Sequence, residues 1–189
     1  MGSGTEVKRI NRELPITYAV IEWLDQDGWP LIFPEVTLPR GLVRGRVDVA
    51  AVSKQFKRTV AVEVKALYHQ DDTENQIFDA QRAAELVFLA APQNVLKRVE
   101  VPSRIGILEA DVGSAPVRLT LVRRAIPGSP EFGCRKEFLH ALMRSALRRG
   151  RIDPTWIRGS CPACLSAGCP LWYAPPEAEV VLDESLESG

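Results

Sequence analysis

Three ionisable residues lie in two apolar segments of this 189-residue chain, where charged side chains are costly to bury. Asp48 lies in "RVDVAAV" (46–52), and Glu63 and Lys65 lie in "TVAVEVKAL" (59–67). Both segments are short apolar runs rich in Val and Ala, which predicts strands, and "SKQFKR" between them is typical of a hairpin turn. Alternation of side chains places Glu63 and Lys65 on one face of their strand, and Asp48 can meet them if the register of the hairpin allows.

Two carboxylates beside an amine could bind a divalent cation and activate water. Carboxylates that lie together repel and resist ionising together, and a bound cation with oxygen ligands, such as Mg²⁺, removes that problem. A neighbouring lysine can orient a water or help to deprotonate it. Metal-activated water with a stabilised leaving oxygen is the chemistry of phosphodiester hydrolysis. The alternative is a surface hairpin in which Glu63 and Lys65 form a salt bridge and Asp48 is solvated.

The segments around these two strands predict an α/β fold. Helical spacing of apolar residues covers 13–26, and a second helix with Thr73 as its N-cap begins the segment 73–89. A third helical segment with an apolar stripe covers 135–149. The order is helix, three strands, helix, strand, two strands, which predicts a central sheet with helices packed on it. The further strands are expected in "LIFPEVTLP" (31–39), "ELVFLAAP" (85–92), "RIGILEAD" (104–111) and "VRLTLVRRA" (117–125).

Asp48 with Glu63-Val64-Lys65 resembles the PD-(D/E)xK motif of the restriction-endonuclease-like nuclease superfamily. The stretch 32–124 resembles MmcB-like DNA-repair proteins and, more remotely, the archaeal Holliday-junction resolvases, through "PEVTLPRGLVRGRVDVAAV", "VAVEVKAL", "LVFLAAP" and "PSRIGILEAD". The resemblance implies a restriction-endonuclease-like core, a central mixed β-sheet flanked by helices, and metal-dependent cleavage of DNA. By position, Asp48 and Glu63 would bind Mg²⁺ or Mn²⁺, and Lys65 would activate or position the water.

The resemblance also implies supporting residues outside the motif. In many relatives a Glu on the first helix adds a metal ligand; Glu22 fits that role best here, and Glu13 is second. Some relatives place a glutamine that supports the site on the helix after the motif, where this chain has Gln76 and Gln81. Gln81 is the candidate for site support, and an exposed helix glutamine is the alternative interpretation.

All four cysteines lie in the last third of the chain, with the spacing C-x26-C-x2-C-x4-C at Cys134, Cys161, Cys164 and Cys169. In a chain without a secretory signal this favours a metal site over disulfides, and four thiolates suit Zn²⁺ or an iron–sulfur cluster. The pattern resembles the iron–sulfur staple of some RecB-type and CRISPR-adaptation nucleases, although their lone cysteine precedes the nuclease core. A [4Fe–4S] cluster is therefore expected, with Zn²⁺ as the alternative. Ligation would stabilise the Pro-rich segment 150–176.

The formal net charge of zero hides an uneven distribution of charge. Residues 135–158 hold seven Lys and Arg, whereas the last thirteen residues hold five acids and no base. Helical spacing of basic residues in the first of these segments predicts a face that contacts DNA phosphates, with a solvated helix face as the alternative. No apolar run approaches the ~20 residues that cross a bilayer, so a cytoplasmic protein without a membrane partner is expected. The expected DNA-binding residues are Arg144, Arg148, Arg149 and Arg151.

Together these features predict an Mg²⁺- or Mn²⁺-dependent deoxyribonuclease of DNA repair, recombination or defence. The expected parts are a nuclease core (1–130), a basic helix with a metal-stapled Cys₄ extension (131–176) and an acidic tail (177–189). A dimer is compatible with two cuts needing two sites. The alternative is a catalytically silent nuclease-fold protein that binds DNA and carries a structural zinc or iron–sulfur site.

Overall fold

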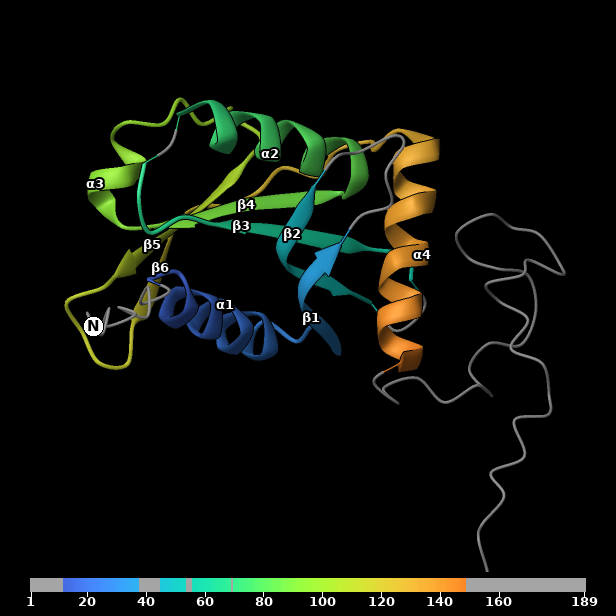
Figure 1. The fold of residues 1–189 in the computed structure, drawn as a ribbon, viewed down its shortest axis with the longest axis horizontal. Helices are drawn as coiled ribbons and strands as arrows, with labels where there is room; N and C mark the ends of the chain where they lie inside the picture. The colour runs from blue at the N-terminus through green and yellow to red at the C-terminus, as the bar shows by residue number, and fades with distance from the viewer. Residues whose placement is uncertain (1–11, 38–44, 54–55, 69, 149–189) are drawn as a thin grey trace, which may run out of the picture.

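A computed structural model describes residues 12–37, 45–53, 56–68 and 70–148 of the chain (Figure 1). The helices and strands follow the order that the sequence predicts, with one addition, the short helix α3 between the fourth and fifth strands. The elements are α1 (Leu14–Gln26), β1 (Leu31–Thr37), β2 (Arg46–Val52), β3 (Thr59–Val64), α2 (Gln70–Ala83), β4 (Leu86–Ala91), α3 (Gln93–Leu96), β5 (Gly106–Asp111), β6 (Arg118–Arg123) and α4 (Phe132–Arg148).

The described strands form one six-stranded mixed sheet in which every strand lies beside its neighbours in sequence. Strand β2 pairs antiparallel with β1 and with β3, β4 pairs parallel with β3 and with β5, and β6 closes the order antiparallel to β5. Parallel neighbours need a crossover connection, and α2 and α3 provide it. The predicted α/β class and the mixed sheet flanked by helices are therefore confirmed.

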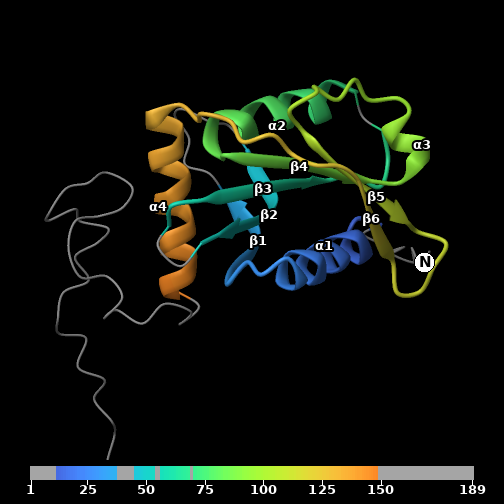
Figure 2. The ribbon, with the colours of Figure 1, turned by 180° about the vertical axis from the view of Figure 1, so that it is seen from behind.

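Helices cover both faces of the sheet. Helix α1 packs on one face, where Ile16 and Val20 share a hydrophobic cluster with Val62 of β3, and α2 and α4 lie on the other side (Figures 1 and 2). Strand β3 is buried on both faces, which is why its sequence is an almost unbroken apolar run. Glu63 is the acidic residue within that run.

Helix α4 belongs to the same hydrophobic core as the sheet. It begins at Phe132, three residues before the predicted start, and Phe138 and Leu142 are buried in one cluster with Phe33 of β1. The expected boundary at residue 130 stays a prediction, but up to residue 148 the chain after it packs into the core before it. Helix α2 also starts earlier than predicted, at Gln70, so the prediction of Thr73 as N-cap is wrong.

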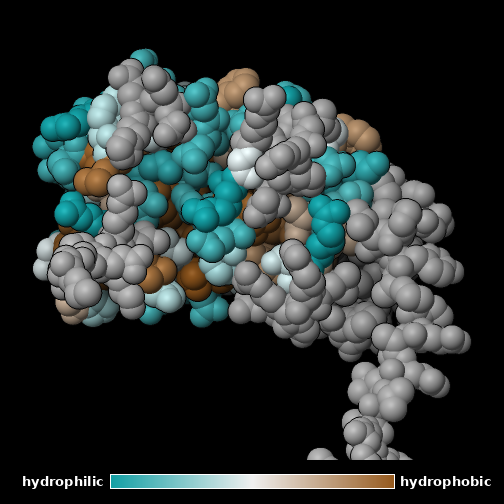
Figure 3. All heavy atoms as spheres, in the orientation of Figure 1, coloured by the Kyte–Doolittle hydropathy of each residue, from teal (hydrophilic) through white to brown (hydrophobic). Residues whose placement is uncertain are grey.

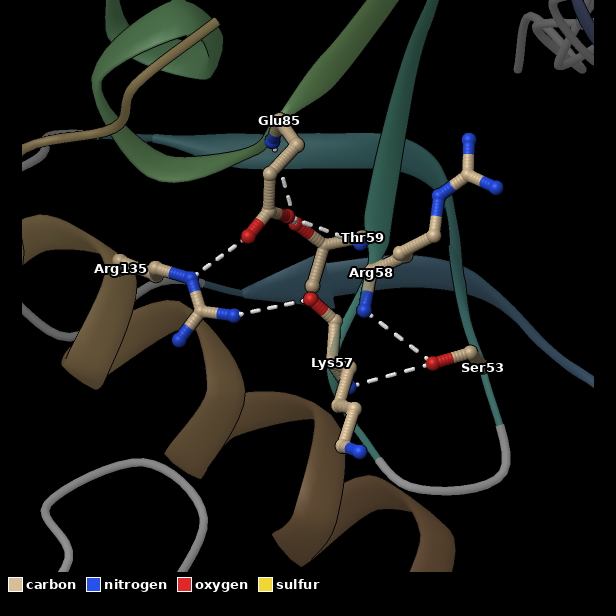
Figure 4. A network of polar contacts seen from close by, with 6 residues as sticks. All are labelled: Ser53, Lys57, Arg58, Thr59, Glu85 and Arg135. Atoms are coloured by element: carbon tan, nitrogen blue, oxygen red, sulfur yellow. Dashed lines mark hydrogen bonds and ion pairs between the residues drawn. The ribbon is translucent and has the colours of Figure 1, made fainter. Parts of the chain in front are cut away.

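A polar network ties the start of α4 to the starts of β3 and β4 (Figure 4). Arg135 donates from Nε to Glu85 Oε1 at 2.6 Å and from Nη2 to the carbonyl oxygen of Lys57 at 3.1 Å. Glu85 Oε2 accepts a 2.8 Å hydrogen bond from the backbone N–H of Thr59 and another from its hydroxyl. Because the Arg135–Glu85 pair is largely buried, it fixes α4 against this end of the sheet.

On the face drawn in Figure 3, hydrophobic side chains of the described residues emerge as separate patches between hydrophilic ones. None of the helices in the described ranges is long and apolar enough to cross a lipid bilayer.

Gly106 makes room for an aromatic side chain in the core, which gives a stability prediction. A Cβ at this position in β5 would overlap the Phe88 ring and lie 2.9 Å from the backbone nitrogen of Ala125. Gly106→Ala is therefore expected to lower the free energy of unfolding by about 1–3 kcal/mol, measured by urea denaturation. Gly128→Ala is the matched control, because its Cβ would lie 3.6 Å from the Glu85 carbonyl oxygen, an ordinary contact. Equal stability of both variants would contradict the overlap.

Candidate functional site

The predicted hairpin brings Asp48 and Glu63 together at one end of the β2–β3 pair. The paired residues end at Val49 and Val62, and one further step in the same register sets Asp48 opposite Glu63. Beyond the paired residues, the Asp48 side chain accepts a hydrogen bond from the neighbouring strand. Its Oδ2 receives a 2.8 Å hydrogen bond from the backbone N–H of Val64. That bond fixes the orientation of the Asp48 carboxylate.

The neighbouring strand is irregular at the same level. Pairing of β1 with β2 continues on both sides of Glu35, which lies opposite Asp48 and has a positive φ of 53°. A non-glycine residue in this region bends the strand locally. Arg46 then lies 3.3 Å from Glu35 Oε1 through Nη1 and 3.8 Å from Asp48 Oδ1 through Nη2. Asp48 consequently has one cation beside each of its oxygens, Arg46 on one side and Lys65 on the other.

Lys65 follows directly after β3 and is held close to Asp48. Its backbone N–H donates to the carbonyl oxygen of Ala90 at 3.0 Å, which continues the β3–β4 pairing. Its Nζ lies 3.9 Å from Asp48 Oδ2, and the residue is only 8% exposed. Lys65 is thus held at its backbone by the bond to Ala90 and at its side chain by the contact with Asp48.

Glu63 is the most strongly perturbed acid of the described residues. It is 1% exposed, and its Oε2 has no hydrogen-bond partner in the described part of the chain. The pKa of Glu63 is raised to about 8, chiefly by burial and then by the negative charge of Asp48 and a hydrogen bond with it, while the positive charges of Lys65 and Arg46 oppose the shift. At neutral pH the Glu63 carboxyl is therefore mostly protonated.

These features fit the divalent cation that the nuclease resemblance implies. A buried oxygen without a partner is costly, and a cation shared by Asp48 and Glu63 would use that oxygen and offset the repulsion between the carboxylates. Within the described ranges, no three His, Cys, Asp or Glu side chains lie close enough together to hold a metal. The remaining ligands would be backbone oxygens, waters or a phosphate, which Mg²⁺ commonly accepts alongside one or two carboxylates.

The structure does not bring Glu22 to this site. Side chains alternate along β3, so Glu63 shares the face of Ala61, which packs toward α2 and α4. Glu22 is exposed on α1, which covers the opposite face, and it lines a surface pocket beside Asp25. Glu13, the second choice, is the N-cap residue of α1.

The glutamine of α2 that fits the site better is Gln76. Because α2 connects parallel strands, it runs back against β3, and its first half lies nearer the Glu63 end of that strand. Gln76 lies in this half, and its Oε1 is buried without a hydrogen-bond partner in the described residues. Gln81 lies in the second half and lines a small pocket with Arg104. The sequence holds a signal for Gln76. Thr73, Ile77 and Ala80 are spaced as the buried face of a helix, and position 76 lies beside that face.

Of the four predicted cysteine ligands, the described residues include Cys134 alone. It lies in the first turn of α4, is 1% exposed, and its Sγ is 3.4 Å from Glu131 Oε2. Burial and then the hydrogen bond with Glu131 raise the pKa of the Cys134 thiol. Because metals bind the thiolate, this environment is unfavourable for a ligand as it stands. Cys161, Cys164 and Cys169 lie outside the described residues.

The predicted DNA-binding arginines are described in part. Arg144 is half-buried on α4, and Arg148 is the last residue of that helix. Arg149 and Arg151 lie outside the described residues. A phosphate-contacting face on α4 therefore stays a prediction.

The fold and the site define a three-layer α/β protein with a carboxylate–lysine cluster at the end of the central hairpin. No family model matches the chain, and no curated protein matches it. A solved structure described as the SPO1766 protein of unknown function from Silicibacter pomeroyi is similar, with a TM-score of 0.55 and 20% sequence identity over 76% of this chain and 91% of that one. This likeness shows the fold alone.

Proposed function

We propose that the protein is a metal-dependent deoxyribonuclease with a restriction-endonuclease-like core, a hydrolase of DNA phosphodiester bonds in repair, recombination or defence. The observation that carries the proposal is the convergence of Asp48, Glu63 and Lys65 at the end of the β2–β3 pair, with a buried Glu63 oxygen that lacks a partner. A salt bridge on a surface hairpin would leave these side chains solvated, whereas Glu63 and Lys65 are buried.

Each residue of the cluster has a role in this proposal. Asp48 and Glu63 would hold Mg²⁺ or Mn²⁺, which, when bound, would lower the pKa of a water and stabilise the leaving oxygen. The Val64 N–H and Arg46 would hold the Asp48 carboxylate in the orientation needed to bind a cation that it shares with Glu63. Lys65 Nζ, which lies 3.9 Å from Asp48 Oδ2, would orient the attacking water or donate a hydrogen bond to the scissile phosphate.

The C-terminal part of the chain would serve the same function. The basic face formed by Arg144, Arg148, Arg149 and Arg151 would contact DNA phosphates and give salt-dependent, sequence-independent affinity. A [4Fe–4S] cluster, or Zn²⁺ in its place, would staple the segment through the four cysteines, and Cys134 would have to leave its buried position to join them. Iron and zinc analysis of anaerobically purified protein tests this part.

A second candidate, a nuclease-fold protein that binds DNA without cutting it, is favoured by one observation. The pKa of Glu63, about 8, keeps its carboxyl mostly protonated at neutral pH, so it can hydrogen-bond to Asp48 as a neutral acid without a metal. In this case the cluster would be structural, and Lys65 would balance the charge of Asp48.

Cleavage of DNA by an Asp48 variant separates the two candidates. The wild type is expected to cut single-stranded, duplex or branched DNA with Mg²⁺ or Mn²⁺ but not in EDTA. Asp48→Asn keeps an acceptor for the Val64 N–H and is expected to lower the rate by more than about 10³-fold, because a neutral amide is a poor ligand for a hard cation. Glu100→Gln, an exposed acid after α3, is the matched control and should cut normally. Salt-sensitive DNA binding by the wild type without any cleavage would favour the second candidate.

A further inference from the structure

A separate cavity of about 410 Å³ lies at the other end of β3 from Glu63. Its lining residues come from the end of α1, the two sides of the β2–β3 turn, the start of β4 and the segment around the end of β6. The lining residues that carry the argument are Trp23, Trp29, Arg58 and Arg124, together with the apolar Leu86 and Leu121.

Two tryptophans and Phe88 form the aromatic part of the wall, and both tryptophans are fixed in orientation. The indole Nε1 of Trp29 donates to Asp27 Oδ2 at 3.0 Å, and the Arg58 guanidinium lies 5.8 Å from the centroid of the Trp29 ring. Trp23 packs edge-on against Phe88, with ring centroids 5.3 Å apart. Both indoles are half-buried, so each keeps part of its surface open to a ligand.

Two guanidinium groups give the cavity a positive charge. Arg58 and Arg124 are exposed, and neither forms an ion pair with another described residue. The backbone N–H of Arg58 bonds to Ser53 Oγ at 3.1 Å, while its side chain points away from the Glu85–Arg135 network (Figure 4). Asp27 is the one acid among the described lining residues, so two positive charges face one negative charge.

We infer that this cavity binds a nucleotide. The base would stack on the Trp29 and Trp23 indoles, and the phosphate would pair with Arg58 and Arg124. Stacking on aromatic rings accepts any base, and guanidinium groups match the geometry of a phosphate. The volume falls in the usual range of small-molecule sites, ~300–1,000 Å³. The nucleotide can be a free 5′-monophosphate or an unpaired residue of a DNA strand.

The cavity is separate from the carboxylate cluster. Nucleotide binding there therefore does not depend on the proposed cleavage of DNA. Arg58 and Glu63 are five residues apart along β3, which is about 16 Å at the rise of an extended strand. Trp23 and Phe88 also belong to the α1 face of the sheet, whereas Glu63 shares the opposite face with Ala61. Binding in the cavity should therefore need no divalent cation and should persist in Asp48→Asn.

Calorimetric titration of the full chain in EDTA tests the inference, with thymidine 5′-monophosphate, thymidine and (dT)₁₀ as probes. We expect saturable binding of the monophosphate and at least tenfold weaker binding of thymidine, which lacks the phosphate. Trp29→Leu should weaken binding by about 5- to 150-fold, the loss that corresponds to ~1–3 kcal/mol of stacking. Arg58→Ala should weaken it by about tenfold or more and lower its salt dependence. Arg98→Ala, an exposed arginine after α3, is the matched control and should leave affinity unchanged.

The affinities of (dT)₁₀ and the monophosphate distinguish an unpaired DNA strand from a free nucleotide as the ligand. Binding of (dT)₁₀ at least tenfold tighter than the monophosphate, with the same dependence on Arg58, assigns the cavity to an unpaired strand, and equal affinity assigns it to free nucleotides. The inference is overturned if no probe binds saturably, if thymidine binds as well as its monophosphate, or if Arg58→Ala binds like Arg98→Ala. The Arg58 substitution lies on the surface, so this comparison holds even if Trp29→Leu folds poorly.

Discussion

Lys65→Met is expected to lower the rate of Mn²⁺-dependent DNA cleavage by about 10²- to 10⁴-fold, the usual contribution of a positioned acid–base group. The substitution fills the space of the buried aliphatic stem but removes the ammonium group 3.9 Å from Asp48 Oδ2. Asp48 keeps its hydrogen bond from the Val64 N–H and its neighbour Arg46, so the fold should be retained. Single-turnover cleavage rates at saturating metal measure the effect.

Metal affinity shows whether Lys65 acts on the reaction or on the metal. Removing a positive charge beside two carboxylates should leave Mn²⁺ bound at least as tightly as in the wild type. Lys97→Met, an exposed lysine whose Nζ donates to Gln93, is the control and should cut at the wild-type rate. A wild-type cleavage rate in Lys65→Met would contradict the role proposed for this residue.

The second large effect that we expect is a dependence of the free energy of unfolding on pH. Its cause is the pKa of Glu63, which is about 8 in the folded chain and has an ordinary value of 4.5. Below pH 4.5 both the folded and the unfolded states hold the proton, and the stabilising contribution is complete. Between pH 4.5 and about 8 the folded state binds more protons than the unfolded state, so the free energy of unfolding falls by up to about 1.4 kcal/mol per pH unit. Above pH 8 the contribution is lost.

Urea unfolding in EDTA at several pH values, compared between the wild type and Glu63→Gln, isolates this contribution. The amide has nearly the shape of the carboxyl group and does not titrate, so the difference between the two proteins should follow the Glu63 curve. Added Mn²⁺ should stabilise the wild type more at pH 8 than at pH 5, since the cation and the proton compete for Glu63. Identical pH profiles for the two proteins would show that Glu63 does not titrate in this window.

The sheet and the centre of the site could be predicted from the sequence because both rest on local patterns. Alternation along β3 sets Glu63 and Lys65 on one face, and a short turn fixes the register that brings Asp48 opposite Glu63. The run of Val and Ala in β3 also indicates burial on both faces, which is the cause of the raised pKa of Glu63.

The supporting residues depend on how distant elements pack, which local patterns do not reveal. Glu22 has the right residue type on the right helix, but α1 covers the face of the sheet opposite to Glu63. Cys134 has a ligand-like spacing, but α4 packs against β1 and buries its thiol in the core. The cavity of Trp29 and Arg58 combines segments that are far apart in the chain, so no short motif marks it.

Calorimetric titration of Mn²⁺ at pH 7, in two buffers of different ionisation enthalpy, tests most directly whether Asp48 and Glu63 hold a cation. We expect one bound Mn²⁺ per chain in the wild type with release of nearly one proton, because Glu63 is mostly protonated before the metal binds. Glu63→Gln should release none and bind more weakly, and Asp48→Asn should lose the site. No binding by the wild type, or binding that neither substitution weakens, would show that Asp48 and Glu63 do not hold a cation.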